Sequence, residues 1–97
     1  MIKVFDDNNI KIIFPQNDII KDHSDELLKI FDELIKNGSI NFTINFSNVK
    51  NIDSKGICTL IILNKIIHKR GKIKIINMND KLKKLFSIIK NSWNLED

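Results

Sequence analysis

The sequence predicts one α/β domain over residues 1–97, with a mixed sheet of four to five strands that carries its helices mainly on one face. Residues 40–46 alternate apolar and polar side chains with the period of two that is typical of a half-buried strand. Residues 24–35 carry apolar side chains at spacings of three and four, which is typical of an amphipathic helix. A chain of 97 residues has the length of one folding unit.

The first predicted elements are a hairpin and a helix. Residues 2–5 and 10–14 are rich in β-branched and aromatic side chains, Asp and Asn fill the turn between them, and Pro15 closes the second strand. The helix begins near Ser24 and stops at Asn37-Gly38. Four residues are expected to cap its start: Asp22, Ser24, Asp25 and Glu26. Its apolar stripe consists of Leu27, Leu28, Phe31, Leu34 and Ile35, and its exposed i,i+4 pairs are Asp25 with Lys29 and Asp32 with Lys36.

The strand at 40–46 has two different faces. Ile40, Phe42, Ile44 and Phe46 are expected to point into the core. The alternate residues Asn41, Thr43 and Asn45 are polar, which predicts that one face of the sheet stays uncovered.

The second half of the chain predicts a helix, a strand and a last helix. The apolar run 57–63 is interpreted as helical because cationic residues and Gly71 follow it, and its single cysteine, Cys58, is expected to be a buried small hydrophobe. Residues 72–77 form a strand, and Asp80 opens a helix. Leu82, Leu85, Phe86 and Ile89 share a face of that helix, and Trp93 and Leu95 are expected to pack back onto it. The order is β-β-α-β-α-β-α, with right-handed crossovers between parallel strands.

The composition indicates an ordinary globular protein, with 42% hydrophobic and 29% charged residues. The start of the chain lacks a signal-peptide pattern, and no apolar stretch approaches the ~18 residues of a membrane span, so a cytoplasmic location is expected.

Residues 50–97 hold eleven Lys or Arg against four acids. A basic nucleic-acid-binding domain therefore stays an alternative, although aromatic stacking residues are missing from its basic segments. The cations concerned are Lys65, Lys69, Arg70, Lys72, Lys74, Lys81, Lys83 and Lys84.

The most informative local feature is the passage from Ile52 through Asp53-Ser54-Lys55-Gly56 directly into the apolar helix. The first N–H groups of a helix have no backbone partner and carry partial positive charge. Asp53 or Ser54 can cap them, and Gly56 leaves room for another surface to approach. The simplest interpretation is an ordinary cap; the functional one is an exposed serine whose phosphorylation would add ~1.5 to 2 negative charges.

Read from end to end, the chain resembles the STAS-domain anti-sigma-factor antagonists of bacteria. The segment that carries the resemblance runs from Ile44 to Ile57 and looks like the family's strand, turn and Asp-Ser-x-Gly-Leu helix entrance. Lys69-Arg70-Gly71-Lys72 and Leu82-Lys83-Lys84-Leu85-Phe86 stand where that family has similar segments. Two positions depart from the pattern: Lys55 stands where many relatives have Ser or Ala, and Ile57 where Leu is usual.

The resemblance implies partner switching. In this family the serine at the position of Ser54 is phosphorylated by an anti-sigma factor that is also a serine protein kinase, and a phosphatase would reverse the modification. The unphosphorylated protein binds the kinase, and phosphorylation releases it. The implied partner-binding residues are Asp53, Ser54, Lys55, Gly56 and Ile57. A STAS module that assembles a signalling complex without phosphorylation is the second alternative.

Catalytic, cofactor and metal sites are not expected. His23 and His68 fall on different predicted helices, at exposed ends, without further ligands at metal-binding spacing. Ser54 has no predictable base beside it, so an enzyme is not expected. The three glycines Gly38, Gly56 and Gly71 are single and far apart, which excludes a phosphate-binding glycine loop.

Overall fold

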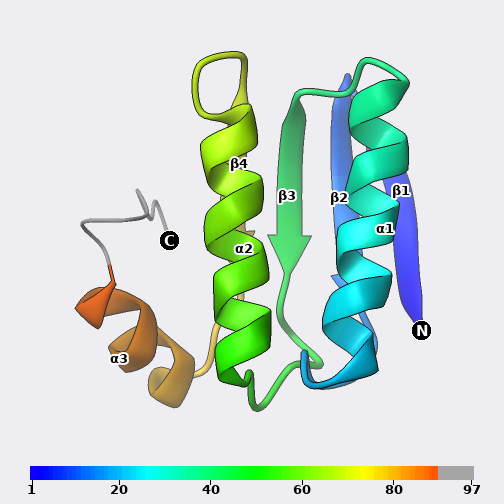
Figure 1. Ribbon diagram of the computed structural model, residues 1–97. Coiled ribbons are helices and arrows are strands. Elements are labelled where there is room, and N and C mark those ends of the chain that lie inside the picture. Colours follow the sequence, from blue (N-terminus) through cyan, green and yellow to red (C-terminus); the bar gives the residue numbers. More distant parts are fainter. Residues whose placement is uncertain (90–97) are drawn as a thin grey trace.

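Four strands form one mixed sheet, and two helices lie side by side against one of its faces, while a third helix lies beside the end of the sheet (Figure 1). This computed structural model describes residues 1–89. The strands are β1 (Ile2–Asp7), β2 (Ile10–Pro15), β3 (Asn41–Asn45) and β4 (Lys72–Ile76). The helices are α1 (Asp22–Lys36), α2 (Ser54–Ile67) and α3 (Asp80–Ile88). The predicted fold class and element order are confirmed, with four strands in the order β1-β2-β3-β4.

The hairpin has longer strands than the sequence predicts. Asn8 and Asn9 alone form its loop, and both have positive φ, 48° and 70°, as a two-residue type I′ turn requires. Pro15 lies inside β2 instead of after it. Because β3 pairs in parallel only with Lys11 to Ile13, the missing N–H of Pro15 breaks no sheet hydrogen bond on that side.

The two faces of the sheet differ as the alternation in β3 predicts. Phe42 and Ile44 are buried under the helices, and the Phe42 ring lies 4.7 Å from the Phe31 ring of α1. Asn41, Thr43 and Asn45 are half-exposed on the open face. Ile40, expected in the core, lies outside β3 and is 39% exposed. The open face also holds two apolar residues that were not predicted there, Phe5 and Ile12. Ile12 pairs with Thr43 and Phe5 pairs with Ile12, so all three side chains lie on the same face of the sheet.

Helix α1 begins earlier than predicted and without any of the four expected caps. Its N-cap is Lys21, whose φ of 48° belongs to a tight turn closed by a 3.0 Å bond from the His23 N–H to the Ile20 carbonyl. Leu28, expected on the apolar stripe, is 40% exposed. The pair between Asp32 and Lys36 is present at 3.0 Å.

Helix α3 is capped by Asn79, one residue before the predicted Asp80, since the Asn79 side chain accepts a 2.8 Å bond from the Leu82 N–H. Leu82 and Phe86 are buried, and the Phe86 ring lies 6.3 Å from that of Phe46. The packing expected of Trp93 and Leu95 falls outside the described residues. Over residues 1–89, each helix is too short or too polar to cross a bilayer.

Candidate functional site

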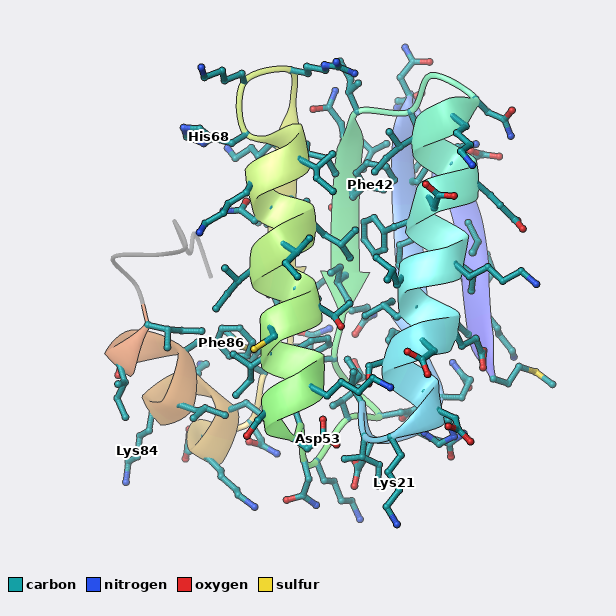
Figure 2. The ribbon with its side chains drawn as sticks, viewed as in Figure 1. Lys21, Phe42, Asp53, His68, Lys84 and Phe86 are labelled. Atoms are coloured by element: carbon teal, nitrogen blue, oxygen red, sulfur yellow. The ribbon has the colours of Figure 1, made fainter. Side chains whose placement is uncertain are left out.

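The turn that leads into α2 is held by the carboxylate of Asp53. One oxygen accepts the Gly56 N–H at 2.8 Å and so caps α2, and the other accepts the Lys21 N–H at 3.0 Å at the start of α1. Figure 2 shows Asp53 and Lys21 together at the same end of the two helices. These two hydrogen bonds hold the pKa of Asp53 below its ordinary value, and the bond from the Lys21 N–H has the larger effect. One carboxylate therefore fastens the starts of both helices.

A second carboxylate, Asp18, holds the loop that precedes this turn. It accepts the Lys50 N–H at 2.8 Å and the Asn51 N–H at 3.1 Å, while the Asn51 side-chain amide donates to its other oxygen. The bond from the Lys50 N–H is the main reason that the pKa of Asp18 lies below its ordinary value, and it outweighs the opposing effect of burial. Nothing in the spacing of the sequence indicated this role of Asp18.

Ile19 and Ile52 form an isolated parallel bridge between the same two loops. The Ile19 N–H donates to the Asn51 carbonyl, and the Asp53 N–H donates to the Ile19 carbonyl, both at 3.2 Å. The segment before α1 and the segment before α2 are thus hydrogen-bonded to each other, and together they support the start of α2 at Ser54.

Ser54 is the first residue of α2 and is exposed. Within residues 1–89 its hydroxyl has no hydrogen-bond partner, because Asp53 and not Ser54 supplies the cap. A hydroxyl in this position is open to a modifying enzyme.

Lys55, the next residue, is turned toward α1. Its ammonium group lies 2.9 Å from the Asp25 carboxylate, and this hydrogen bond raises the pKa of Lys55. The sequence predicted that Asp25 pairs with Lys29 along α1; in the structure Asp25 pairs with Lys55 instead. The cation beside Ser54 is therefore already engaged.

Gly56 is buried and faces the chain's own backbone. A Cβ atom at this position would lie 2.6 Å from the Ile19 carbonyl oxygen and 2.7 Å from Cγ1 of Ile52. A glycine at this position predicts that another surface comes close to the turn. In the structure that surface belongs to the chain's own residues Ile19 and Ile52, and not to a partner. Ile57, which follows, is half-buried.

An apolar stripe runs along the exposed side of α2, starting one turn after Ser54. We define this stripe as Cys58, Ile62 and Ile66, which recur every four residues and so lie on one side of the helix. Ile62 is 53% exposed and Ile66 is 51% exposed, so the two side chains present adjoining apolar surface on one side of the helix. The predicted burial of Cys58 is wrong, because the helix buries its opposite side, with Leu60, Leu63 and Ile67.

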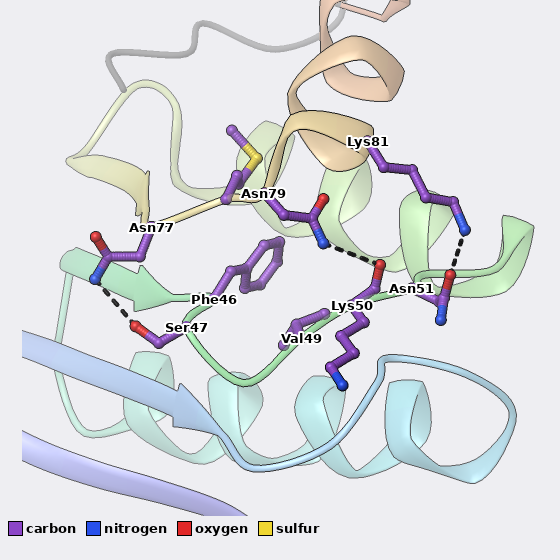
Figure 3. A pocket seen from close by; sticks show the side chains of 9 residues that line it. Phe46, Ser47, Val49, Lys50, Asn51, Asn77, Asn79 and Lys81 are labelled. Carbon is purple, nitrogen blue, oxygen red and sulfur yellow. Dashed lines mark hydrogen bonds between the residues drawn. The ribbon is translucent and has the colours of Figure 1, made fainter.

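A hollow of about 800 Å³ lies near the turn, between the ends of β3 and β4 and the start of α3 (Figure 3). The Asn77 amide donates to the Ser47 hydroxyl at 3.1 Å, and the Asn79 amide donates to the Lys50 carbonyl at 3.3 Å. The polar groups at the rim of the hollow thus bind one another and hold the loop that follows β3 against the start of α3. The hollow is lined by Phe46, Ser47, Val49, Lys50, Asn51, Asn77, Met78, Asn79 and Lys81.

The two histidines do not lie together. His68 is exposed at the end of α2 (Figure 2), as expected, but His23 is half-buried, with Nδ1 2.8 Å from the Asp18 carbonyl oxygen. Among residues 1–89, no three His, Cys, Asp or Glu side chains are grouped so that they could hold a metal ion.

Comparison with known proteins gives one family and several structures. The family model of the STAS domain matches residues 2–92. TM1081 of Thermotoga maritima, a candidate anti-sigma factor antagonist, has a TM-score of 0.88 at 19% identity, over 97% of this chain and 82% of that one. The phosphorylated form of SpoIIAA, a cell fate determinant of Bacillus, has a TM-score of 0.80 at 13% identity, over 100% and 90% of the two chains.

An anti-sigma factor antagonist of Mycobacterium paratuberculosis has a TM-score of 0.82 at 12% identity, over 98% of this chain and 83% of that one. No curated protein matches the sequence itself. At these identities the structural likeness establishes the fold.

Proposed function

Because the chain belongs to the STAS domain family, we propose that it is an anti-sigma-factor antagonist that acts by partner switching. Unphosphorylated, it binds an anti-sigma factor that is also a serine protein kinase; phosphorylation of Ser54 releases it, and a phosphatase resets it. In this proposal the protein works in the cytoplasm, catalyses no reaction and needs no cofactor.

The docking surface in this proposal is the Ser54 turn together with the apolar stripe of α2. Ser54, Lys55 and Ile57 would contact the partner, while Asp53 and Gly56 would hold the turn in shape from behind. The stripe supplies apolar area, and the turn at its head supplies polar specificity.

A phosphate on Ser54 would act mainly through charge. It adds ~1.5 to 2 negative charges next to Asp53, and the cation that follows in the sequence, Lys55, is already bound to Asp25. Burying such a charge at an interface without a partner group costs several kcal/mol, at least about a hundredfold in affinity. The observation that carries the proposal is that the exposed Ser54 stands at the head of an exposed apolar stripe.

The direct test is phosphorylation. The protein is incubated with ATP and each serine-kinase-like anti-sigma factor of its own organism, and the modified residue is mapped by mass spectrometry. We expect phosphate on Ser54. Phosphate on another residue, or on none with every candidate kinase, contradicts the proposal.

The binding test uses three variants and calorimetry with the same kinase. Ser54→Asp is expected to abolish the complex, and Ser54→Ala to preserve it. Ser87→Asp is the matched control, because Ser87 is also an exposed helical serine but lies on α3. If Ser54→Asp binds as tightly as the unmodified chain, the second candidate is favoured, a STAS module that uses the apolar stripe in a complex without phosphorylation.

A further inference from the structure

Strand β1 is an edge of the sheet, and its outward backbone groups are open. The two-residue loop makes Asp7 and Ile10 a hydrogen-bonded pair. Bonded and non-bonded pairs alternate along antiparallel strands, so Phe5 with Ile12 and Lys3 with Phe14 are also hydrogen-bonded pairs. The bond from the Gln16 N–H to the Met1 carbonyl, 2.9 Å long, continues this alternation. The N–H and C=O groups of Ile2, Val4 and Asp6 therefore point away from the sheet, and within residues 1–89 they have no partner.

The side chains of this edge are self-complementary about Phe5. Lys3 and Asp7 stand two residues before and two residues after Phe5, on the same face of the strand, and they carry opposite charges. We propose that two copies of the chain pair their β1 strands antiparallel about Phe5, which joins the two sheets into one of eight strands.

This register satisfies backbone and side chains together. Val4 of each copy faces Asp6 of the other, and these are the residues whose backbone groups point outward, so two bonds form at each of the two pairs. Lys3 faces Asp7 twice, and opposite charges directly across antiparallel strands attract. Phe5, 49% exposed, faces its own copy and continues the apolar row that it forms with Ile12 on the open face.

Other pairings lack this match. Pairing about Val4 would place Lys3 opposite Phe5, so that neither Lys3 nor Asp7 faces an opposite charge, while Asp6 is bound to Lys11 of its own chain in either register. The other edge of the sheet, β4, has Lys72 and Lys74 on its open face, and pairing about Lys74 would set two ammonium groups against each other. Lysines therefore protect β4 from self-pairing, whereas the charges of β1 favour it.

The pairing leaves the proposed docking surface free. A two-fold axis perpendicular to the sheet keeps the helices of both copies on the same side. In Figure 1, β1 lies at the edge behind α1, while α2 lies over the opposite half of the sheet. Ser54 and the apolar stripe are thus remote from the new contact.

Charge reversal tests the pairing in the full chain with any tag at the C-terminus. Sedimentation velocity over a wide range of concentrations is expected to show a particle of twice 11.3 kDa. Lys3→Asp, and separately Asp7→Lys, should each weaken dimerisation about tenfold, since each sets like charges opposite one another twice. The double variant should restore the original dimerisation constant to within about threefold. A chain that stays monomeric, single variants without effect, or a double variant without rescue each overturn the proposal.

Disulfide trapping tests the register. With Cys58→Ser as background, Phe5→Cys places two thiols across a non-hydrogen-bonded pair, at Cα distances near 4.5 Å that a disulfide can span. We expect rapid cross-linking of Phe5→Cys on mild oxidation. Val4→Cys is the matched control, because in this register the two Val4 positions are displaced along the strands by more than a disulfide spans. Cross-linking of Val4→Cys in preference to Phe5→Cys overturns the register.

Discussion

Two residues at the start of α2, its N-cap Asp53 and Gly56 in its first turn, connect segments that lie far apart in the sequence. Asp53 receives hydrogen bonds from the start of α1 and from the first turn of α2. Gly56 lets α2 contact the Ile19–Ile52 bridge directly. Their effects on stability are open to measurement without any partner protein.

Replacing Gly56 by alanine should destabilise the fold. The added methyl group would lie 2.6 Å from a backbone oxygen, so the helix or the Ile19 segment must shift. We expect the free energy of unfolding to fall by about 1–3 kcal/mol in urea denaturation. Ser54→Ala, two residues earlier and exposed, is the control and should stay within about 0.5 kcal/mol. An unchanged stability of Gly56→Ala would mean that this contact is loose.

The depressed pKa values of Asp18 and Asp53 predict acid sensitivity. Both pKa values lie below the ordinary 3.8 because backbone N–H groups bind the charged form. A carboxyl whose pKa is lower in the folded state stabilises the fold above its unfolded pKa, and this contribution is lost as the pH falls through the folded value. Urea midpoints should therefore be steady above about pH 5 and should decline below 3.8. In Asp53→Asn the decline should be shallower, and a curve parallel to that of the unmodified chain would contradict this role.

At the scale of elements, α2 combines a buried side that holds the fold with an exposed apolar side. Ile62→Ser should leave the free energy of unfolding within about 0.5 kcal/mol, because Ile62 is 53% exposed. The same substitution should weaken binding of the anti-sigma factor about tenfold, as calorimetry can measure.

The matched control is Leu60→Ala in the same helix. Leu60 is fully buried, so this change should cost about 2–5 kcal/mol of stability. If Ile62→Ser lowers stability as much as Leu60→Ala does, the stripe belongs to the core and not to a docking surface.

The elements differ in how far the sequence predicts them. β3 was predicted well because its polar and apolar residues alternate, and α3 because its apolar residues recur at helical spacing. For α2 the helix was predicted but not its buried side, because apolar residues occur all around it and leave no periodic contrast. Cys58 was misplaced for this reason.

The start of α1 and the open face were missed because they depend on distant partners. The start of α1 has no side-chain cap and is held from outside the helix by Asp53, whereas four nearby residues were expected to cap it. Phe5 and Ile12 reach the open face through the hairpin register, which a two-residue Asn8-Asn9 loop fixes. At the site, the turn and the exposure of Ser54 followed from local chemistry, whereas the inward role of Gly56 required the packing of Ile19.

At the scale of the whole molecule, the two proposed surfaces lie on different parts of the fold. The β1 edge would serve self-association, and the α2 side would serve the kinase. If they are independent, Ser54→Asp should leave the dimerisation constant within about twofold of the original in sedimentation experiments. A change of tenfold or more would mean that the two surfaces overlap or are coupled.

The bond between Asp53 and Lys21 also bears on how the nascent chain acquires its shape. The two residues are 32 positions apart, so the backbone group that opens the first helix must wait for a carboxylate made about 2–6 seconds later, at typical rates of synthesis. The N-terminal half on its own lacks that anchor. A ribosome-bound intermediate that ends before residue 53 should therefore hold a frayed helix, a substrate for chaperones or proteases until translation moves on.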